Sequence, residues 1–449
     1  MSVKVAAEYL PKQACRVETA EKKVVVVREY EEREKLAVEE LERQCEAGQQ
    51  QQGKPSLFTD LMGDPLCRAR HVPLHIMLVA EYGEGEIVGV IRGCIKTVTR
   101  GNSIYVKLAY ILGLRVSLTH RPNMAMSNPS KVYLSPSVSF HQLLISSMHS
   151  GCHIQVSLTS RRLGIGTKLV QKLEEWCKQK GAEYAYMATD YTNEASINLF
   201  TQKCSYMKFR TPTMLVQPVH AHHKPIGSSI AIVKLTPQLA ESIYHRTFAN
   251  SEFFPKDIDN ILSNKLNLGT FMALPKNSFL KWDPKTGILP PSFAILSVWN
   301  TKEVFKLQVM GVSKLTYLCC MGTRLVDACM PWLRLPSFPD VFRQFGVYTL
   351  YGLHMEGQTK RTARSLMKSL CAFAHNLARD EVGCGAVVAE VGQWDPVREA
   401  IPHWKRFSWA EDLWCIKKLA DSSEKCDTAD WIKSQSSNSS VIFVDPRDF

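Results

Sequence analysis

The feature that most constrains how this chain folds is a basic, glycine-rich turn at residues 161–168, with sequence RRLGIGTK. Its two glycines are one residue apart, so the backbone can turn tightly and expose its N–H groups. An amphipathic helix is predicted to start at once, and its first turn offers unpaired N–H donors and the positive end of the helix dipole. Together with Arg161, Arg162 and Lys168, these groups predict a phosphate or pyrophosphate site. A plain glycine turn with a basic face is the alternative.

The segments downstream alternate between predicted strands and helices. Residues 182–189 are apolar or aromatic at nearly every position and predict a buried strand. Residues 193–200 predict a short helix, and 204–210 predict a further strand. With the apolar run at 108–118 in front of the turn, the order is strand, glycine loop, helix, strand, helix, strand. This order indicates an α/β fold with a mixed sheet.

The pattern resembles the GNAT superfamily of acyl-CoA-dependent N-acetyltransferases. In that family a loop of the form R/Q-x-x-G-x-G/A wraps the pyrophosphate of coenzyme A, and a later N-x-x-S/A-x-x-L-Y segment flanks its pantetheine. Both patterns occur here in that order, the second with Phe200 in place of the tyrosine. The resemblance implies acetyl-CoA as co-substrate. The cofactor-binding residues that it implies are Leu114, Val116, Arg161, Arg162, Leu163, Gly164, Ile165, Gly166, Thr167, Asn193 and Ser196.

Longer segments narrow the resemblance to the plant Hookless-type N-acetyltransferases. They include residues 56–65, 91–98, 107–116, 252–259 and 443–449, and the similarity covers nearly the whole chain. This resemblance implies a protein lysine, including a histone lysine, as acceptor. It also implies a nuclear protein, with cytoplasm as a second location, that acts in growth controlled by ethylene, auxin or light. The residues themselves fix neither the acceptor nor whether the chain forms a homo-oligomer.

Residues 121–160 depart from the family pattern. They hold ten serines and no Asp or Glu, and they show no sustained helical or strand period. A structureless segment of this length inside a compact domain is uncommon. Without it, the strand at 108–118 joins the glycine loop directly, as the family requires. We therefore interpret the block as an intron translated in frame, and a genuine regulatory loop is the alternative.

The chemistry implied by the resemblance needs a proton acceptor and an oxyanion donor. A neutral amine attacks the thioester directly, so a base or a chain of waters must take its proton. The thioester oxygen gains charge and needs a fixed N–H donor, which the family draws from the strand before the loop, here near Leu114 to Val116. Tyr110, Glu81 and Asp190 are the candidate catalytic residues, because they lie on or beside strands expected to face the site. A surface or packing role is the alternative for each.

The departing thiolate also needs a proton, which the family takes from the tyrosine that Phe200 replaces. Tyr206, Tyr191 or water would have to substitute. This departure keeps open a second hypothesis, namely a regulatory or scaffold protein that keeps the GNAT fold and binds CoA without turnover.

Composition excludes several other classes. No run of 18 apolar residues occurs, so we expect no membrane partner. The 14 cysteines form no C-x-x-C pattern, and His220, His222 and His223 share a Pro-bearing loop without cysteine or carboxylate neighbours, so we expect no metal. The net charge is +12, yet no basic run with interleaved aromatic residues indicates direct sequence-specific binding of nucleic acid.

The second half of the chain repeats the predicted order of elements. Residues 292–299 and 304–309 predict a hairpin, 347–354 a strand, and residues 357–360 stand where the phosphate loop stood. A second, degenerate GNAT-like domain follows, with an unrelated α/β domain as the alternative. One glycine replaces the G-x-G, so tight CoA binding is not expected there. The predicted divisions are an N-terminal extension at 1–23, a GNAT domain at 24–215, the second domain at 225–420 and a tail at 421–449.

Overall fold

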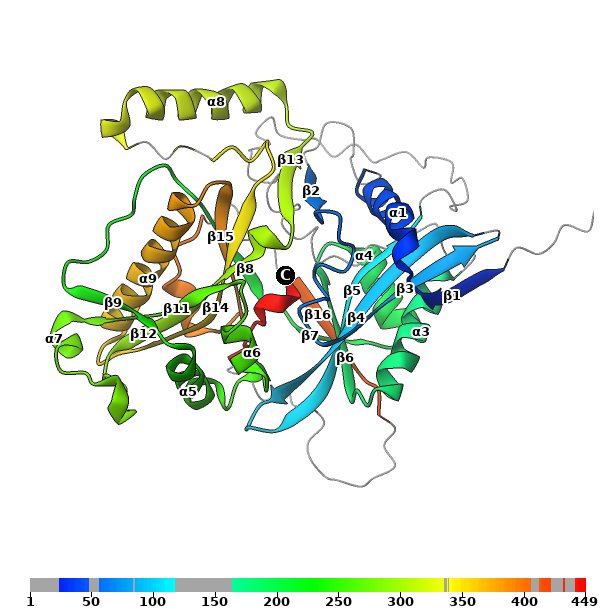
Figure 1. Ribbon diagram of the computed structural model, residues 1–449, viewed down its shortest axis with the longest axis horizontal. Coiled ribbons are helices and arrows are strands. Elements are labelled where there is room, and N and C mark those ends of the chain that lie inside the picture. Colours follow the sequence, from blue (N-terminus) through cyan, green and yellow to red (C-terminus); the bar gives the residue numbers. More distant parts are fainter. Residues whose placement is uncertain are drawn as a thin grey trace, which may run out of the picture.

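The structure is a computed structural model that describes residues 24–47, 56–83, 85–117, 164–334, 337, 339–404, 412–420, 431–432 and 441–449. Two large β-sheets with their helices stand side by side (Figure 1). The predicted N-terminal extension, most of the predicted C-terminal tail and the whole serine-rich block at 121–160 lie outside the described residues. Among the residues described, no helix is long and apolar enough to cross a lipid bilayer.

The first sheet has the strand order β1-β3-β4-β5-β6-β16-β7, and β10 pairs with β4. All of its pairings are antiparallel except that of β5 with β6, which α3 connects. The strands are β1 (Val25–Glu29), β3 (Leu74–Tyr82), β4 (Glu86–Arg100), β5 (Tyr105–Val116), β6 (Tyr184–Asp190), β7 (Met207–Arg210), β10 (Glu252–Pro255) and β16 (Asp412–Lys418).

Two helices cover opposite faces of this sheet. Helix α3 (Ile165–Gln179) packs on the residues of one face, including Leu78 and Ile91, through an apolar stripe spaced as predicted. Helix α1 (Lys35–Ala47) packs on Val79 and Val90. Val79 follows Leu78 and Val90 precedes Ile91, so both valines point to the other face of the sheet. The short helix α4 (Glu194–Asn198) follows β6 and continues into the π-helical turn η4 (Leu199–Lys203).

The second sheet has the strand order β8-β15-β14-β12-β11-β9. Its strands are β8 (Thr213–Pro218), β9 (Ile230–Leu235), β11 (Asn267–Pro275), β12 (Phe293–Asn300), β14 (Gly346–Glu356) and β15 (Cys384–Val391). Its helices are α5 (Pro237–Phe248), α6 (Ile258–Leu262), α7 (Lys276–Phe279), α8 (Lys314–Cys329) and α9 (Lys360–Asp380). Helix α9 joins β14 to β15, which is the parallel pair of this sheet.

The two sheets share one topology, as the predicted repeat requires. Strands β9, β11, β12, β14 and β15 follow one another across the second sheet as β1, β3, β4, β5 and β6 do across the first. The strand that follows β6 in the first sheet, and the one that follows β15 in the second, each come from the other half of the chain. Strand β16, from the second half, lies beside β6, and β8, from the first half, lies beside β15. The first sheet thus contains β10 and β16 from the second half of the chain, and the second sheet contains β8 from the first half. The division into 24–215 and 225–420 stays a prediction.

One predicted element is wrong. Residues 292–299 and 304–309 do not form a hairpin with each other, because β12 pairs with β11 and β14. Strand β13 (Lys306–Met310) instead pairs with β2 (Ser56–Asp60) in a separate two-stranded sheet. The 3₁₀ turn at Thr301–Glu303 redirects the chain between the two strands. Turn-linked apolar runs indicate strands, but they do not fix which strands pair.

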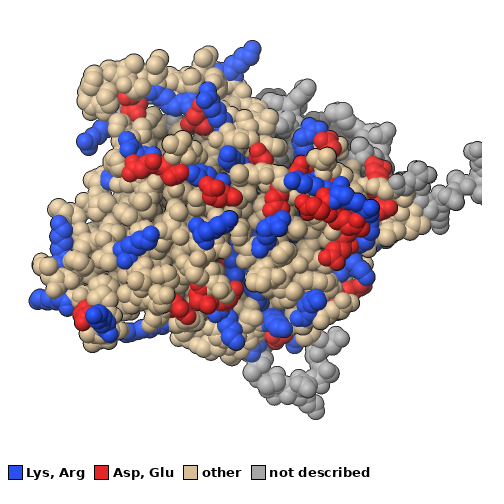
Figure 2. Space-filling view, viewed as in Figure 1, with Lys and Arg blue, Asp and Glu red and all other residues tan. Residues whose placement is uncertain are grey.

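The main core lies between the two sheets and includes the segment 441–449, whose end is marked C near the middle of Figure 1. Separate cores form under α3 and under α9. Charges on the face seen in Figure 2 are mixed, with acidic side chains between the Lys and Arg.

Candidate functional site

Strands β5 and β6 pair over only part of their length. Their parallel register runs from Leu108 opposite Tyr184 to Ile111 opposite Met187, and β5 then continues to Val116 without β6. Gly113 follows almost at once with φ of +61°, at a point where the register of β5 with β4 shifts. This is a bulge, and it occurs where the strands part. Backbone groups of β5 beyond the parting need partners from outside the sheet.

Helix α3 begins beside this parting without a side-chain cap. Its N-cap is Gly164, with φ of +64°, and no side-chain cap hydrogen bond is made there. The carbonyl of Gly164 accepts from Lys168 N at 2.9 Å, so the helix is regular from its first turn. The amides of Ile165, Gly166 and Thr167 are the first N–H groups of such a helix, and they have no intrahelical partners. The described part of the predicted turn thus presents free backbone amides at the start of α3, and Arg161, Arg162 and Leu163 lie outside the described residues.

Gly166 brings three predicted parts of the site together. A Cβ atom built on it would lie 3.4 Å from Leu199 Cδ2 and 4.0 Å from side-chain atoms of Leu114 and Val116. The start of α3, the end of β5 and the turn after α4 thus converge at one point. Larger side chains at this position would press on all three.

Asn193 and Ser196 lie at the start of α4, just before the turn that contacts Gly166 through Leu199. Asn193 is the N-cap of α4, and its side-chain oxygen accepts from Ser196 N at 3.1 Å. The Ser196 side chain is fully buried, and its Oγ has no hydrogen-bond partner in the described structure. A buried hydroxyl without a partner costs free energy, so a ligand that bonds to Ser196 would recover that cost.

The equivalent place in the second sheet differs in one decisive respect. Strands β14 and β15 part after Leu350 opposite Ala389, and Gly352 follows with φ of +60°, as Gly113 does in the first sheet. Helix α9 is nevertheless capped, because the Thr359 hydroxyl accepts from Thr362 N at 3.1 Å. A Cβ on Gly352 would also lie 2.5 Å from the buried Tyr244 hydroxyl. A Cβ on Gly113 would likewise lie 2.6 Å from Arg92 Nη1, so a side chain fills the space at both bulges, and the two places differ in the cap of the helix.

The three predicted catalytic residues do not converge. Tyr110 is buried on β5, and its ring stacks on that of Tyr186 with centroids 4.6 Å apart. Glu81 lies on β3, which is separated from β5 by β4, and forms an ion pair with Arg28 at 2.7 Å. The register of the sheet therefore leaves Tyr110 nearest to the parting of β5 and β6.

Asp190, the third candidate, ends β6. Its Oδ1 accepts from Thr192 N at 2.6 Å and holds the turn into α4. It stands opposite Asp412 of β16 in the sheet register. Burial, reinforced by the neighbouring charge of Asp190, raises the pKa of Asp412 well above its ordinary value. Sequence analysis missed Asp412 because the partner strand comes from the far end of the chain.

The aromatic side chains near α4 do not supply an evident acid. Phe200 is fully buried, and its ring meets that of Tyr206 edge-on with centroids 5.1 Å apart. Tyr206 is buried as well, and burial raises the pKa of its hydroxyl far above the ordinary value. Tyr191 is 54% exposed.

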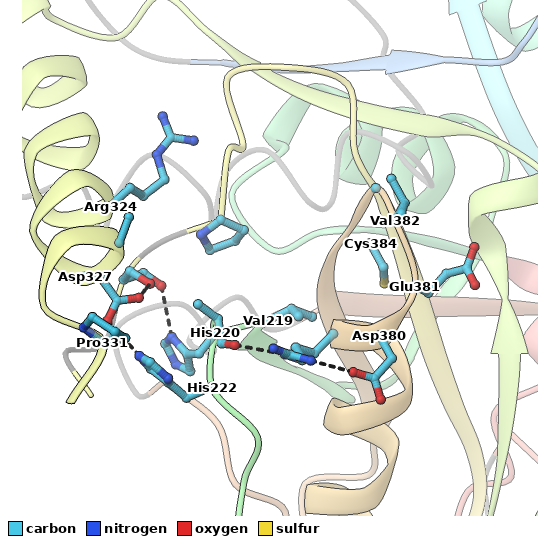
Figure 3. Close-up of a pocket in the computed structure, with 16 residues that line it drawn as sticks. Val219, His220, His222, Arg324, Asp327, Pro331, Asp380, Glu381, Val382 and Cys384 are labelled. Carbon is cyan, nitrogen blue, oxygen red and sulfur yellow. Dashed lines mark hydrogen bonds and ion pairs between the residues drawn. The ribbon is translucent and has the colours of Figure 1, made fainter. Parts of the chain in front are cut away.

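A separate cavity of about 880 Å³ lies in the second half of the molecule, between α8 and the ends of α9 and β15 (Figure 3). His222 Nε2 pairs with Asp327 Oδ1 at 2.7 Å, and the Ser337 hydroxyl donates to Asp327 Oδ2 at the same distance. The Ser337 hydroxyl thus bonds to the carboxylate and not to the imidazole. A nucleophilic serine would instead bond to the imidazole that serves as its base. Across the described ranges, no three His, Cys, Asp or Glu side chains are arranged to hold a metal ion.

A fold with parted parallel strands over an uncapped, glycine-led helix is that of an acyl-CoA-binding acetyltransferase. The sequence matches the model of the acetyltransferase (GNAT) family over residues 150–206, which include β6, α3 and α4. The match begins inside the serine-rich block, so the departure from the family pattern is narrower than the predicted 121–160.

Relatives over the full length define the family more closely. The chain is 46% identical to "Probable N-acetyltransferase HLS1" and 45% identical to "Probable N-acetyltransferase HLS1-like", both of Arabidopsis thaliana. Each alignment covers 95% of this chain, with 100% and 99% of the relative. It is 37% identical to "Acetyl transferase GW6a" of rice, over 96% of this chain and 99% of that protein. The chain belongs to this family of GNAT acetyltransferases, as the predicted resemblance stated.

Solved structures are more distant. Saccharomyces cerevisiae N-myristoyltransferase with bound myristoyl-CoA is 10% identical, with a TM-score of 0.48 over 92% of this chain and 81% of that chain. A GCN5-related N-acetyltransferase from Kribbella flavida is 13% identical, with a TM-score of 0.41 over 88% and 71%.

Proposed function

We propose that this protein transfers an acetyl group from acetyl-CoA to an amine at the parting of β5 and β6. The observation that carries the proposal is the uncapped start of α3 at Gly164, next to backbone groups of β5 that β6 does not pair. The pyrophosphate of CoA would accept hydrogen bonds from the first amides of α3, and the helix dipole would favour its charge. The pantetheine would lie along β5, with Asn193 and Ser196 on its other side.

The same geometry supports the polar part of the reaction. As the amine nitrogen attacks the thioester carbon, the carbonyl oxygen gains negative charge and needs a fixed donor. A backbone N–H of β5 near Leu114, beyond the bulge at Gly113, is the donor that this arrangement offers. It belongs to a strand held by β4, so it needs no reorganisation during the reaction.

The proposed acceptor is the side-chain amine of a protein lysine, with histone lysines as a specific candidate. The names of the relatives support N-acetylation. The acceptor class, a nuclear location and a role in hormone- or light-controlled growth come from the Hookless-type resemblance. The proposal places part of the protein in the cytoplasm. It does not involve direct, sequence-specific binding of nucleic acid.

A second candidate function is a CoA-binding regulatory protein without turnover. The observation that favours it is that the described aromatic side chains after α4 supply no evident acid, since Phe200 has no proton to give and Tyr206 is buried. Water can protonate a departing thiolate, so this observation does not exclude the transferase activity.

The deciding experiment uses radiolabelled acetyl-CoA with purified core histones, on the full chain and on the same chain without residues 121–160. Acetyl-CoA-dependent labelling of lysine in either form, absent from a mixture lacking the protein, supports the transferase. CoA binding by calorimetry with no transfer to histones or to free polylysine in either form favours the regulatory protein. A protein that neither binds CoA nor transfers the acetyl group would contradict both candidate functions.

A further inference from the structure

The segment 441–449 carries charged side chains into the core between the two sheets. Asp445 and Arg447 are both buried and pair with each other at 2.7 Å, and Arg447 also pairs with Asp257 at 2.7 Å. Burial opposes the ionisation of Asp445, but Arg447 and Lys96 outweigh it and lower its pKa. These contacts fix the path of the segment through the core.

Asp448 of this segment is placed differently from Asp445. Its carboxylate accepts from the Tyr186 hydroxyl at 2.7 Å and from Lys96 Nζ at 2.5 Å. The Asp448 side chain is 13% exposed, whereas those of Lys96 and Asp445 are each 2% exposed. Asp448 is thus more exposed than Asp445 and Lys96, while a hydroxyl and an ammonium hold its carboxylate in position.

The cluster lies beside the point where β5 and β6 part. Tyr186 stands opposite Tyr110 in the register of β5 with β6, one pair before the strands part at Ile111 and Met187. Both rings belong to the core between the sheets, on the face away from α3. A CoA whose phosphates rest on α3 and whose pantetheine passes between the strands brings its thioester towards this face.

We propose that Asp448 accepts the proton of the acceptor amine, with Tyr186 and Lys96 as the residues that position its carboxylate. The proposal rests on the proposed function, because it names the base for that same reaction. Asp448 takes the place of Glu81 as the candidate base, because Glu81 forms an ion pair with Arg28. The stacked rings of Tyr110 and Tyr186 then lie beside the site.

The proposed step balances in atoms and charge. The ammonium of the acceptor gives one proton to the Asp448 carboxylate, and the freed lone pair forms the C–N bond with the thioester carbon. The electron pair of the C–S bond leaves on sulfur as the carbonyl re-forms. The nitrogen loses its second proton, and the thiolate gains one through water, which yields the amide and CoA thiol.

The surroundings of Asp448 set the direction of its titration. Burial raises its pKa, while Lys96 and the Tyr186 hydroxyl act to lower it. The groups that face the pair are Lys96 and Cys94 of β4, Tyr110 of β5, Tyr186 of β6, and Asp445 and Arg447 of the same segment. Because the hydrogen bond from Tyr186 lowers the pKa of Asp448, loss of the Tyr186 hydroxyl should shift that pKa upwards.

The test compares Asp448→Asn, Tyr186→Phe and the control Glu252→Gln in the full chain. Turnover is measured with acetyl-CoA and core histones from pH 5 to 9, with CoA affinity and the melting temperature alongside. Glu252 is a buried carboxylate paired with Arg210 at 2.7 Å on β10, so its loss perturbs the same core without touching Tyr186.

We expect Asp448→Asn to lower kcat by about 100-fold or more, with CoA affinity unchanged, because general bases typically contribute that much. Tyr186→Phe should move the acidic limb of the pH profile to higher pH, since a hydrogen bond to the carboxylate is lost. Glu252→Gln should lower the melting temperature and leave the limb in place. If Asp448→Asn does not fold, the displaced limb of Tyr186→Phe decides the question.

Unchanged turnover in Asp448→Asn, or an unmoved limb in Tyr186→Phe, would overturn the assignment while leaving the proposed function intact. If the unaltered chain binds CoA but acetylates neither histones nor polylysine, the proposed function fails, and this assignment fails with it.

Discussion

The N-terminus of α3 can be tested by placing a charge on it. Gly164 has φ of +64°, and a Cβ atom there would meet nothing within 4 Å among the residues that the structure describes. Gly164→Asp and Gly164→Asn therefore both fit, and each pays a similar left-handed strain of about 1 kcal/mol. The two side chains have the same shape and differ in charge alone. Asp is also favoured at a helix N-terminus, so the aspartate variant should be no less stable than the asparagine variant.

The two variants should separate in their affinity for CoA. An aspartate carboxylate about 4 Å from a pyrophosphate charge costs about 4 kcal/mol at an effective dielectric constant of about 20. That value is an upper bound, so we expect Gly164→Asp to bind CoA about 100- to 1,000-fold more weakly than Gly164→Asn, because each 1.4 kcal/mol is about tenfold.

Titration calorimetry at low and high salt, with thermal melts of both variants, measures this difference. The gap should narrow as salt rises, because screening weakens exposed charge interactions. Equal affinity of the two variants for CoA at low salt would refute the assignment of the pyrophosphate to this helix.

Three further predictions concern residues around and opposite the site. Ser196→Ala should leave stability nearly unchanged without ligand, because it removes a buried hydroxyl that has no described partner, and should weaken CoA binding about fivefold by calorimetry, the value of one ordinary hydrogen bond. Thr359→Ala should destabilise the protein by about 1 kcal/mol in urea melts, the value of a lost cap, without altering CoA affinity; a weaker CoA complex would instead assign the ligand to α9. Because burial raises the pKa of Asp412 in the folded state, its ionisation costs stability as pH rises above the unfolded value near 4. Asp412→Asn should therefore raise the melting temperature at pH 7 and give no such gain at pH 3, and an unchanged melt at pH 7 would count against this.

The local features of the site are largely predictable from the sequence. The order of strand, glycine turn, helix and strand is written in adjacent residues, and Gly164, Gly166, Asn193 and Ser196 lie as that order predicts. The reason is physical, since turn chemistry and apolar period act over short stretches of chain. The capping hydroxyl of Thr359 is equally local, and it explains why the second helix start differs from the first.

The long-range features are not predictable in the same way. The run at β16 has the composition of a strand, but nothing in it says that it inserts between β6 and β7. Sequence analysis likewise singled out Glu81, whose partner Arg28 lies on a neighbouring strand. Lys96 did give a signal, because a lysine within a mostly apolar strand such as β4 implies a buried partner. The partner, Asp448, lies more than 300 positions away and is found only in the fold.

The central claim is that the uncapped start of α3 and the parted strands β5 and β6 hold CoA. A crystal structure of the complex tests this most directly. The pyrophosphate should lie on the amides of Ile165 to Thr167 and the pantetheine along β5 beyond Ile111. CoA bound at the start of α9, or in the cavity between α8 and β15, would contradict it.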